Sequence, residues 1–201
     1  KGYYDRFRGR LIFPIFNLRG QIIAFGGRVL DEGLPKYINS PETPVYIKGH
    51  NLYGLNFAAE SIREKDYCLI VEGYLDLITP YQAGFKNIGA SLGTSLTVEQ
   101  VRLIKRYTKN VIMVYDPDLA GEAATLRGLD LFVEEDMLVK IINLPQGLDP
   151  DDFIRQKGEK EFSLLIEQAL DLFDYKLGLL TAKYNVSDLV PKAKIVAEML
   201  P

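Results

Sequence analysis

Acidic side chains stand at or just beyond the ends of three hydrophobic segments of this chain. They form three groups: Glu72, Asp116 with Asp118, and Asp149 with Asp151 and Asp152. Carboxylates that converge on one site repel one another unless cations occupy that site. Hard oxygen ligands select Mg²⁺ or Mn²⁺, and Mg²⁺ typically takes one or two carboxylates together with substrate phosphates. The residues therefore indicate metal-dependent chemistry on a phosphate-bearing substrate, provided that the fold brings the three groups together.

The segments that precede these acids are typical of buried strands. Strands are predicted over residues 67–71, 86–90, 111–115 and 138–144, and helices over residues 74–83, from residue 97 onward, and over residues 119–133. The helix after Thr97 begins with a capping box, in which Thr97 and Gln100 each satisfy a backbone donor. Strands that alternate with helices of this length indicate a parallel α/β sheet. Ligands of such sheets bind at the carboxyl ends of the strands, so the acidic groups are expected to share one crevice.

The regions before and after this α/β pattern differ from it. Residues 10–16 and 21–25 are predicted strands joined by a hairpin connection at 17–20, Gly26 and Gly27 form a further predicted turn, and residues 56–65 form a predicted helix. After Asp149 the pattern is helical to the end, with a loop near residues 185–188. We therefore divide the chain into a basic mixed α/β subdomain (1–65), a metal-binding α/β subdomain (66–155) and a helical subdomain (156–201).

Composition narrows the class of protein. The chain has 201 residues, is 47% hydrophobic and carries a net charge of −3, with +4 in residues 1–59 and −7 in the remainder. The overall acidity argues against a chain that simply coats nucleic acid. The single cysteine, Cys68, excludes a disulfide framework and a cysteine-built zinc site within this chain. No apolar run approaches the ~18 residues that a membrane span needs.

Several longer motifs carry a resemblance to a known family. The segments Val71-Glu72-Gly73-Tyr74-Leu75-Asp76 and Val114-Tyr115-Asp116-Pro117-Asp118 resemble the two signatures of a TOPRIM domain, the metal-binding module of bacterial primases and topoisomerases. The basic subdomain, with Phe25-Gly26-Gly27-Arg28, Lys36-Tyr37-Ile38-Asn39-Ser40-Pro41 and Lys48-Gly49, resembles that of bacterial replicative primases of the DnaG type. The segment Leu144-Pro145-Gln146-Gly147-Leu148-Asp149-Pro150-Asp151 is similar to the same family, so the resemblance covers nearly all of residues 1–158.

The resemblance implies a fold and an activity. The expected fold is a Rossmann-like TOPRIM sheet, mainly parallel and flanked by helices. The expected activity is that of a nucleotidyltransferase that makes short RNA primers on single-stranded DNA during replication. The resemblance assigns Mg²⁺, replaceable by Mn²⁺, to five acids: Glu72, Asp116, Asp118, Asp149 and Asp151. Among these, Glu72, Asp116 and Asp118 would be catalytic, with Glu72 also able to accept a proton.

Basic and polar residues of the first subdomain would meet the other reactants. The predicted nucleotide-binding residues are Arg28, Lys36, Tyr37, Asn39 and Lys48, with the three cations placed in loops. Arg6, Arg8 and Arg10 alternate at period two, so they are expected to share one strand face that follows the template backbone. The resemblance also implies a replicative helicase and a zinc-binding module as partners through regions outside this chain, and a place in the bacterial cytoplasm at the replication fork. The single cysteine and the short apolar runs predict no zinc and no membrane association within the chain itself.

Other functions share parts of this pattern. The Asp116–Asp118 spacing also resembles the nucleophile motif of haloacid-dehalogenase-type phosphatases, but Ala120 stands where those enzymes have Thr or Val. A topoisomerase-type TOPRIM protein and a non-catalytic recombination scaffold are further alternatives. One residue departs from the primase pattern: Pro117 replaces the usual glycine between the two aspartates, which fixes φ near −65° and removes an N–H donor.

Overall fold

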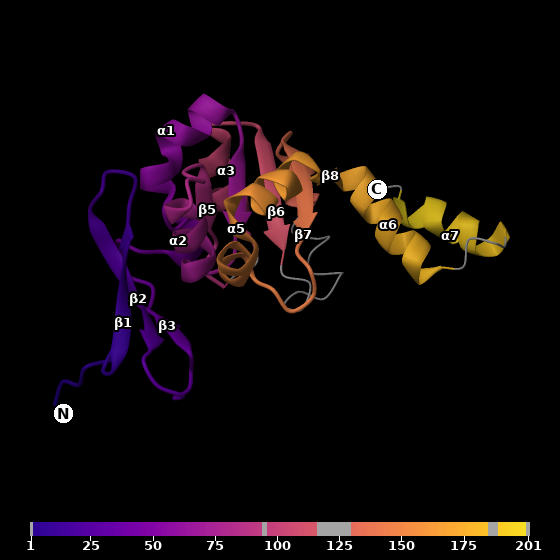
Figure 1. Ribbon diagram of the computed structural model, residues 1–201. Helices are drawn as coiled ribbons and strands as arrows, with labels where there is room; N and C mark the ends of the chain where they lie inside the picture. The colour runs from indigo at the N-terminus through magenta and orange to yellow at the C-terminus, as the bar shows by residue number, and fades with distance from the viewer. Residues whose placement is uncertain (1, 94–95, 116–129, 185–188, 200–201) are drawn as a thin grey trace.

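The computed structural model describes residues 2–93, 96–115, 130–184 and 189–199 (Figure 1). Asp116, Asp118 and most of the helix predicted over 119–133 lie outside these ranges. The part of that helix within them, residues 130–133, is helical, and the helix continues to residue 134. No helix in the described part of the chain is both long and apolar enough to span a membrane.

A five-stranded sheet forms the centre of the molecule, in the order β5-β4-β6-β7-β8. Its strands are β4 (Cys68–Val71), β5 (Ile88–Ala90), β6 (Asn110–Tyr115), β7 (Leu138–Asn143) and β8 (Leu170–Asp171). The first four pair in parallel, and β8 pairs with β7 in the antiparallel sense. The prediction of an α/β fold with a mainly parallel sheet is confirmed. The prediction of helix throughout the region after Asp149 is wrong at β8, a two-residue edge strand too short to leave a periodic pattern.

Helices cover both faces of this sheet because successive strand residues point to opposite sides. Leu69 and Val71 of β4 face the core that contains α2 (Tyr74–Gln82) and α5 (Pro150–Glu167). Cys68 and Ile70 face the opposite core, which contains α1 (Leu55–Lys65) and α3 (Val98–Lys105). All four residues of β4 are buried, as expected of a strand covered on both faces.

A second, three-stranded antiparallel sheet is built from β1 (Arg10–Phe16), β2 (Ile22–Val29) and β3 (Tyr37–Asn39). The predicted hairpin connection is confirmed: the Asn17 and Gln21 backbones pair, and Oδ1 of Asn17 accepts hydrogen bonds from the N–H groups of Arg19 and Gln21. The prediction of a turn at Gly26 and Gly27 is wrong, because both lie inside β2.

The physical reason for the glycine at position 26 is the close approach of a buried tyrosine. A Cβ atom on Gly26 would lie 2.0 Å from the hydroxyl oxygen of Tyr74, the first residue of α2. A glycine inside a strand often marks such a close approach. The three-stranded sheet is therefore packed directly against the first turn of α2, beside the end of β4.

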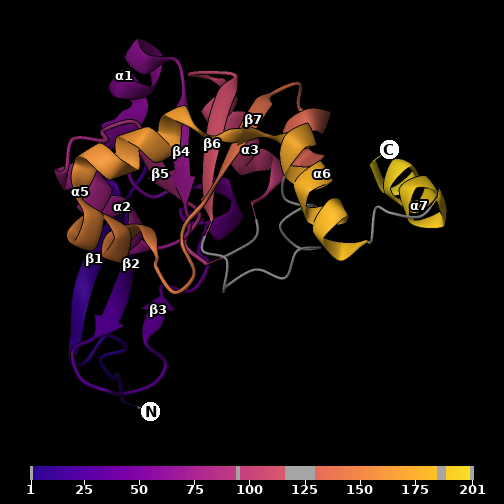
Figure 2. The same cartoon turned by 45° about the vertical axis from the view of Figure 1, so that its right-hand side comes forward.

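The last helices extend away from the sheet. Helices α6 (Leu172–Lys183) and α7 (Leu189–Met199) pack on each other at the side opposite the three-stranded sheet (Figures 1 and 2). Tyr175 of α6 reaches the core beside α3, which anchors the pair to the rest of the molecule. The domain boundaries at residues 65 and 155 stay predictions.

Candidate metal centre and nucleotide site

The parallel strands bring their carboxyl ends to one edge of the sheet. Glu72 directly follows β4, and Asp149 caps the start of α5 after the loop that leaves β7. In Figure 1 the arrowheads of β6 and β7 point toward the side on which the three-stranded sheet extends. Two of the three predicted acidic groups therefore lie at the expected edge. The third, Asp116 and Asp118, lies outside the described residues, and its predicted role stays a prediction.

Three aspartates gather at the first turn of α5. Asp149, Asp151 and Asp152 each offer a carboxylate oxygen, and these oxygens all lie within 4.8 Å of one another. Oδ1 of Asp149 accepts a 2.7 Å hydrogen bond from the N–H of Asp152, which caps the helix. The positive end of the helix dipole favours negative charge here. The first turn of α5 therefore brings the three acids close together.

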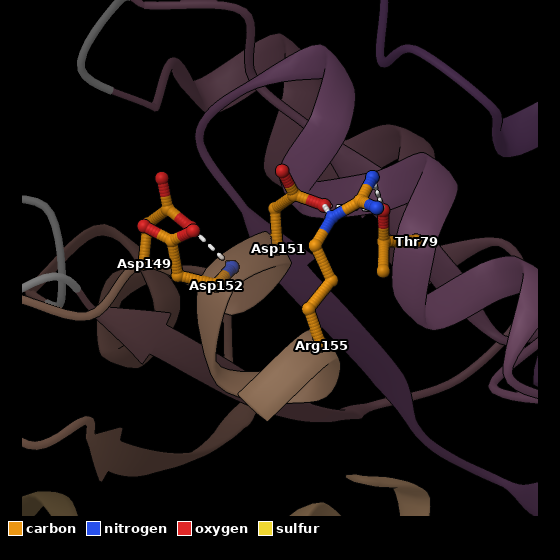
Figure 3. A network of polar contacts seen from close by, with 5 residues as sticks. All are labelled: Thr79, Asp149, Asp151, Asp152 and Arg155. Atoms are coloured by element: carbon orange, nitrogen blue, oxygen red, sulfur yellow. Dashed lines mark hydrogen bonds and ion pairs between the residues drawn. The ribbon is translucent and has the colours of Figure 1, made fainter. Parts of the chain in front are cut away.

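Asp151 is held by side chains of two helices (Figure 3). Its Oδ1 atom accepts hydrogen bonds from the hydroxyl of Thr79 on α2, at 2.5 Å, and from Nε of Arg155 on α5, at 2.6 Å. Arg155 lies one helical turn after Asp151 and forms an ion pair with it. Thr79 and Arg155 were not predicted as site residues, since a threonine and an arginine on helices carry no motif that distinguishes them from surface residues.

A further acid, Asp76, was also missed as a site residue. Its carboxylate accepts a 2.9 Å hydrogen bond from the N–H of Gly73, at the start of α2. Burial, followed by the charge of Asp149, raises the pKa of Asp76 to about 7, with smaller contributions from Asp151 and Glu72. The hydrogen bond from Gly73 acts in the opposite direction. The signal in the sequence was its place at the end of the motif Val71-Glu72-Gly73-Tyr74-Leu75-Asp76, which resembles a TOPRIM signature.

This donor set fits a divalent metal ion. All of the ligand atoms are carboxylate oxygens, which hard divalent cations prefer. Asp76, Asp149, Asp151 and Glu72 interact through their charges, and each of the other three raises the cost of ionising Asp76. A bound cation would remove that cost, so the acidic edge is suited to divalent metal binding.

The predicted nucleotide-binding residues of β2 and β3 lie beside this acidic edge. Oδ1 of Asn39 accepts a 2.7 Å hydrogen bond from the hydroxyl of Tyr74, two residues after Glu72. The ring of Tyr37 stacks toward Tyr74 with a centroid distance of 6.1 Å, and the guanidinium of Arg28 lies over the Tyr37 ring at 5.9 Å. Arg28 was expected in a loop, but it lies within β2, paired with Tyr37 of β3.

The charges of the acids also act on Tyr37. Burial raises the pKa of Tyr37, the positive charge of Arg28 opposes that rise, and Asp76, Asp151 and Asp149 add to it. Such an effect requires that Tyr37 lie within the field of the acidic edge. The structure thus brings Arg28, Tyr37 and Asn39 to the acidic edge, although they are far from these acids in the sequence.

Lys48 was expected in a loop, but it begins the short 3₁₀ helix η1 (Lys48–His50). The amide of Gln100 donates to the carbonyl of Asn51 at 2.8 Å, and the hydroxyl of Thr97 donates to the carbonyl of Gly49. The predicted capping box of Thr97 and Gln100 is confirmed, and it also fixes η1 in place. Partial burial lowers the pKa of Lys48. Lys36 lies in the loop before β3, as predicted.

The predicted arrangement of the three arginines is wrong. Residues 6–9 form a turn, so Arg6 and Arg8 do not lie on a strand, and only Arg10 belongs to β1. Gly9 has a φ of +67°, which breaks the extended backbone that the alternation of arginines required. The guanidinium of Arg10 donates to the carbonyls of Gly27, at 3.4 Å, and Lys36, at 3.3 Å. Arg10 therefore braces β2 against the Lys36 loop, whereas Arg6 and Arg8 lie in the preceding turn.

Comparison with known proteins identifies the family. Residues 1–59 match the model of the DNA primase catalytic core, N-terminal domain, and residues 69–154 match the Toprim-like model. The DNA primase of Clostridium acetobutylicum is 48% identical over 199 residues, and that of Escherichia coli K12 is 40% identical over 201 residues. The chain belongs to the DnaG-type primase family. The predicted family is therefore confirmed, and the phosphatase and topoisomerase alternatives are not favoured.

Solved structures of DnaG-type primases have the same architecture. A DnaG catalytic core is 40% identical with a TM-score of 0.88, and a DNA primase domain from Pseudomonas aeruginosa is 40% identical with a TM-score of 0.87. In each comparison 98% of this chain covers 65% of the other. The matches to the Clostridium and Escherichia primases cover 99% and 98% of this chain, but only 33% and 35% of those longer proteins.

Proposed function

We propose that this chain is part of the catalytic core of a DNA primase, which joins ribonucleotides on a single-stranded DNA template. The observation that carries the proposal is the hydrogen bond that joins Asn39, a predicted nucleotide-binding residue, to Tyr74, which lies two residues after the predicted metal ligand Glu72. Tyr74, beside the acidic edge, donates to Asn39 of the predicted nucleotide site. A nucleotidyl transfer needs a metal site and a triphosphate site side by side, and this hydrogen bond joins them.

The metal site comprises the acids at the carboxyl ends of the strands. Glu72, Asp149 and Asp151 would hold Mg²⁺, or Mn²⁺ in its place, together with Asp116 and Asp118, while Asp76 and Asp152 add negative charge beside them. When bound, the metal would stabilise charge on the attacking and leaving oxygens of an in-line displacement at phosphorus. Glu72 is also the acid that can accept the proton of the attacking 3′-hydroxyl.

The triphosphate site comprises Arg28, Lys36 and Lys48, with Tyr37 and Asn39 at the sugar or base. Lys48 is held by η1 and by the start of α3, so its side chain departs from a fixed backbone. Charge-assisted contacts from lysine and arginine suit phosphate oxygens. Arg28 lies on β2, where its guanidinium stands over the Tyr37 ring.

Template contacts are assigned to the turn before β1. Arg6 and Arg8 lie in this turn and Arg10 begins the strand. One solved relative, 40% identical with a TM-score of 0.87, is described as the DnaG primase catalytic domain bound to single-stranded DNA. Another, from Aquifex aeolicus, is described as the zinc-binding and RNA polymerase domains of the primase. A zinc-binding module and a replicative helicase are proposed as partners through regions outside this chain, with bacterial cytoplasm at the replication fork as the location.

A primer-synthesis assay tests this function. The chain is incubated with single-stranded DNA, labelled ribonucleoside triphosphates and Mg²⁺ or Mn²⁺, and short RNA products are resolved on a gel. We expect template-dependent RNA, a loss of at least a hundredfold in Glu72→Gln, and full retention in Glu64→Gln, which alters an exposed acid on α1. Equal activity in Glu72→Gln and the unmodified chain would contradict the assignment. Strand cleavage or phosphate release without RNA would favour one of the other enzyme classes.

A further inference from the structure

Asp151 uses one of its two carboxylate oxygens for protein contacts. Oδ1 accepts both the Thr79 hydroxyl, at 2.5 Å, and Nε of Arg155, at 2.6 Å. Figure 3 shows the other oxygen on the side away from Arg155. The side chain of Asp151 is 14% exposed, so its carboxylate is largely enclosed by these partners.

The hydroxyl of Thr79 has a defined direction. Nη2 of Arg155 lies 3.4 Å from Oγ1 of Thr79, and a guanidinium can only donate. Oγ1 therefore accepts from Arg155 and directs its own proton to Asp151. Thr79 is buried between α2 and α5, two helices that pack extensively on each other beside the sheet. The three side chains form a closed triangle that joins the two helices.

We propose that Thr79 is a positioning residue for the metal site and that Arg155 is the counter-charge of Asp151, and this inference rests on the proposed function. Together they fix Oδ1 of Asp151, so that Asp151 offers a single oxygen, Oδ2, to a divalent cation. Thr79 is neutral and buried, and its hydrogen bond fixes the orientation of the Asp151 carboxylate. Arg155 is 60% exposed and positively charged, and it supplies the counter-charge for Asp151 when no metal is bound.

The two residues are therefore expected to affect metal binding in opposite directions. Loss of the Thr79 hydroxyl frees the carboxylate to rotate, and an oriented ligand is lost. Loss of the Arg155 charge leaves Asp151 held by Thr79, but it removes a positive charge that repels the incoming cation. The same change leaves the acidic edge without compensation in the metal-free protein. A purely structural role would instead weaken metal binding and stability together in both variants.

The test measures Mn²⁺ binding and metal-free stability in the same variants. Free Mn²⁺ is followed by its paramagnetic resonance signal, and the melting temperature is recorded in EDTA and in Mn²⁺. The variants are Thr79→Val, Thr79→Ser and Arg155→Met. Lys157→Met is the control, because it removes one exposed positive charge from the same helix, two residues further on.

We expect Thr79→Val to weaken Mn²⁺ binding about fivefold and Thr79→Ser to restore it. We expect Arg155→Met to bind Mn²⁺ twofold to fivefold more tightly at low salt and to melt at a lower temperature in EDTA. Addition of Mn²⁺ should raise the melting temperature of this variant more than it raises that of the unmodified chain. Lys157→Met should match the unmodified chain. Unchanged Mn²⁺ binding in Thr79→Val, or weaker Mn²⁺ binding in Arg155→Met, would overturn this inference but leave the proposed metal site intact. A complete absence of Mn²⁺ binding by the unmodified chain would overturn the metal site and this inference with it.

Discussion

The hydroxyl of Tyr74 donates a 2.7 Å hydrogen bond to Oδ1 of Asn39, and the two residues belong to different parts of the molecule. Asn39 ends β3 of the antiparallel sheet, and Tyr74 begins α2, directly after the acidic end of β4. The Tyr74 ring stacks on Phe13 of β1 at 4.5 Å and meets Tyr53 edge-on at 4.8 Å. These interactions set the position of the predicted nucleotide site relative to the predicted metal site.

Tyr74→Phe is predicted to weaken nucleotide binding without affecting metal binding, because it removes the hydroxyl and keeps the packing of the ring. One partly buried hydrogen bond is lost, so the free energy of unfolding should fall by about 1 kcal/mol. Asn39 loses its partner, and the apparent affinity for nucleotide should fall severalfold, whereas Mn²⁺ affinity should stay unchanged. Thermal melting and nucleotide titration measure these effects. Tyr81→Phe, on the same helix, is the control, and an equal loss in both variants would contradict the role of the Tyr74 hydroxyl.

The pKa of Asp76 predicts how stability depends on pH in the metal-free protein. Burial first, and then the charge of Asp149, raises this pKa from 3.8 to about 7. The folded state therefore holds the proton more tightly than the unfolded state, so the contribution of Asp76 to stability is greatest below about pH 4 and falls as pH rises toward 7. Each unit of pKa shift corresponds to about 1.4 kcal/mol, so the loss should reach a few kcal/mol.

Asp76→Asn should remove this pH dependence. The asparagine can still accept the hydrogen bond from Gly73, but it carries no charge. In EDTA at pH 8 the variant should be more stable than the unmodified chain, and at pH 4 the two should be similar. Urea unfolding at the two pH values measures this. A variant that is less stable at pH 8 would show that the Asp76 charge stabilises the fold.

Lys48→Met should impair the use of nucleotide more than the binding of DNA. A lysine paired with a triphosphate makes charge-assisted hydrogen bonds worth about 1.5–3 kcal/mol. Its loss should raise the apparent nucleotide requirement roughly tenfold to a hundredfold, at about 1.4 kcal/mol per decade. Titrations with labelled nucleotide and labelled single-stranded DNA separate the two effects, with Lys160→Met as the control on exposed α5 surface. If only the DNA titration changes, Lys48 belongs to the template site.

The three arginines before and within β1 should behave differently from one another. Arg6→Ala and Arg8→Ala should reduce the salt dependence of single-stranded DNA binding, by about 0.7 for each phosphate that is no longer neutralised, with little change in stability. Arg10→Ala should also destabilise the fold, because its guanidinium donates to the carbonyls of Gly27 and Lys36. Affinity measured across a salt series, together with melting temperatures, distinguishes the cases. An unchanged salt slope in Arg6→Ala and Arg8→Ala would place the template elsewhere.

The parallel sheet was predictable because its signals are local. Cys68–Val71 is a short, wholly apolar run, and Thr97 with Gln100 forms a recognisable cap, so both elements follow from neighbouring residues. The edge of the sheet that carries Glu72 and Asp149 follows from the parallel order of strands alone. The predictions failed where a distant side chain decides the local backbone. Gly26 resembles a turn residue, but it lies in a strand because Tyr74 needs the space of the missing Cβ.

Sequence motifs point to the acids of the candidate site, but they do not point to the residues that contact these acids. Asp149 and Asp151 stand in a motif, whereas Thr79 and Arg155 reach Asp151 only after α2 and α5 have packed together. The alternation of Arg6, Arg8 and Arg10 indicated a strand, but the positive φ of Gly9 means that the strand begins only at Arg10. A period-two spacing places side chains on one face of a strand only where the backbone is continuously extended.

The most direct test of the metal and triphosphate sites is the position of Mn²⁺ in crystals soaked with Mn²⁺ and a ribonucleoside triphosphate, located by anomalous scattering. We predict Mn²⁺ bound to carboxylate oxygens among Glu72, Asp149 and Asp151, with the triphosphate between the metal and the side chains of Lys48 and Arg28. We further predict that the Asp151 ligand atom is Oδ2, with Oδ1 still held by Thr79. Mn²⁺ bound away from these acids would contradict the metal site, and a triphosphate bound away from the residues of β2, β3 and η1 would contradict the triphosphate site.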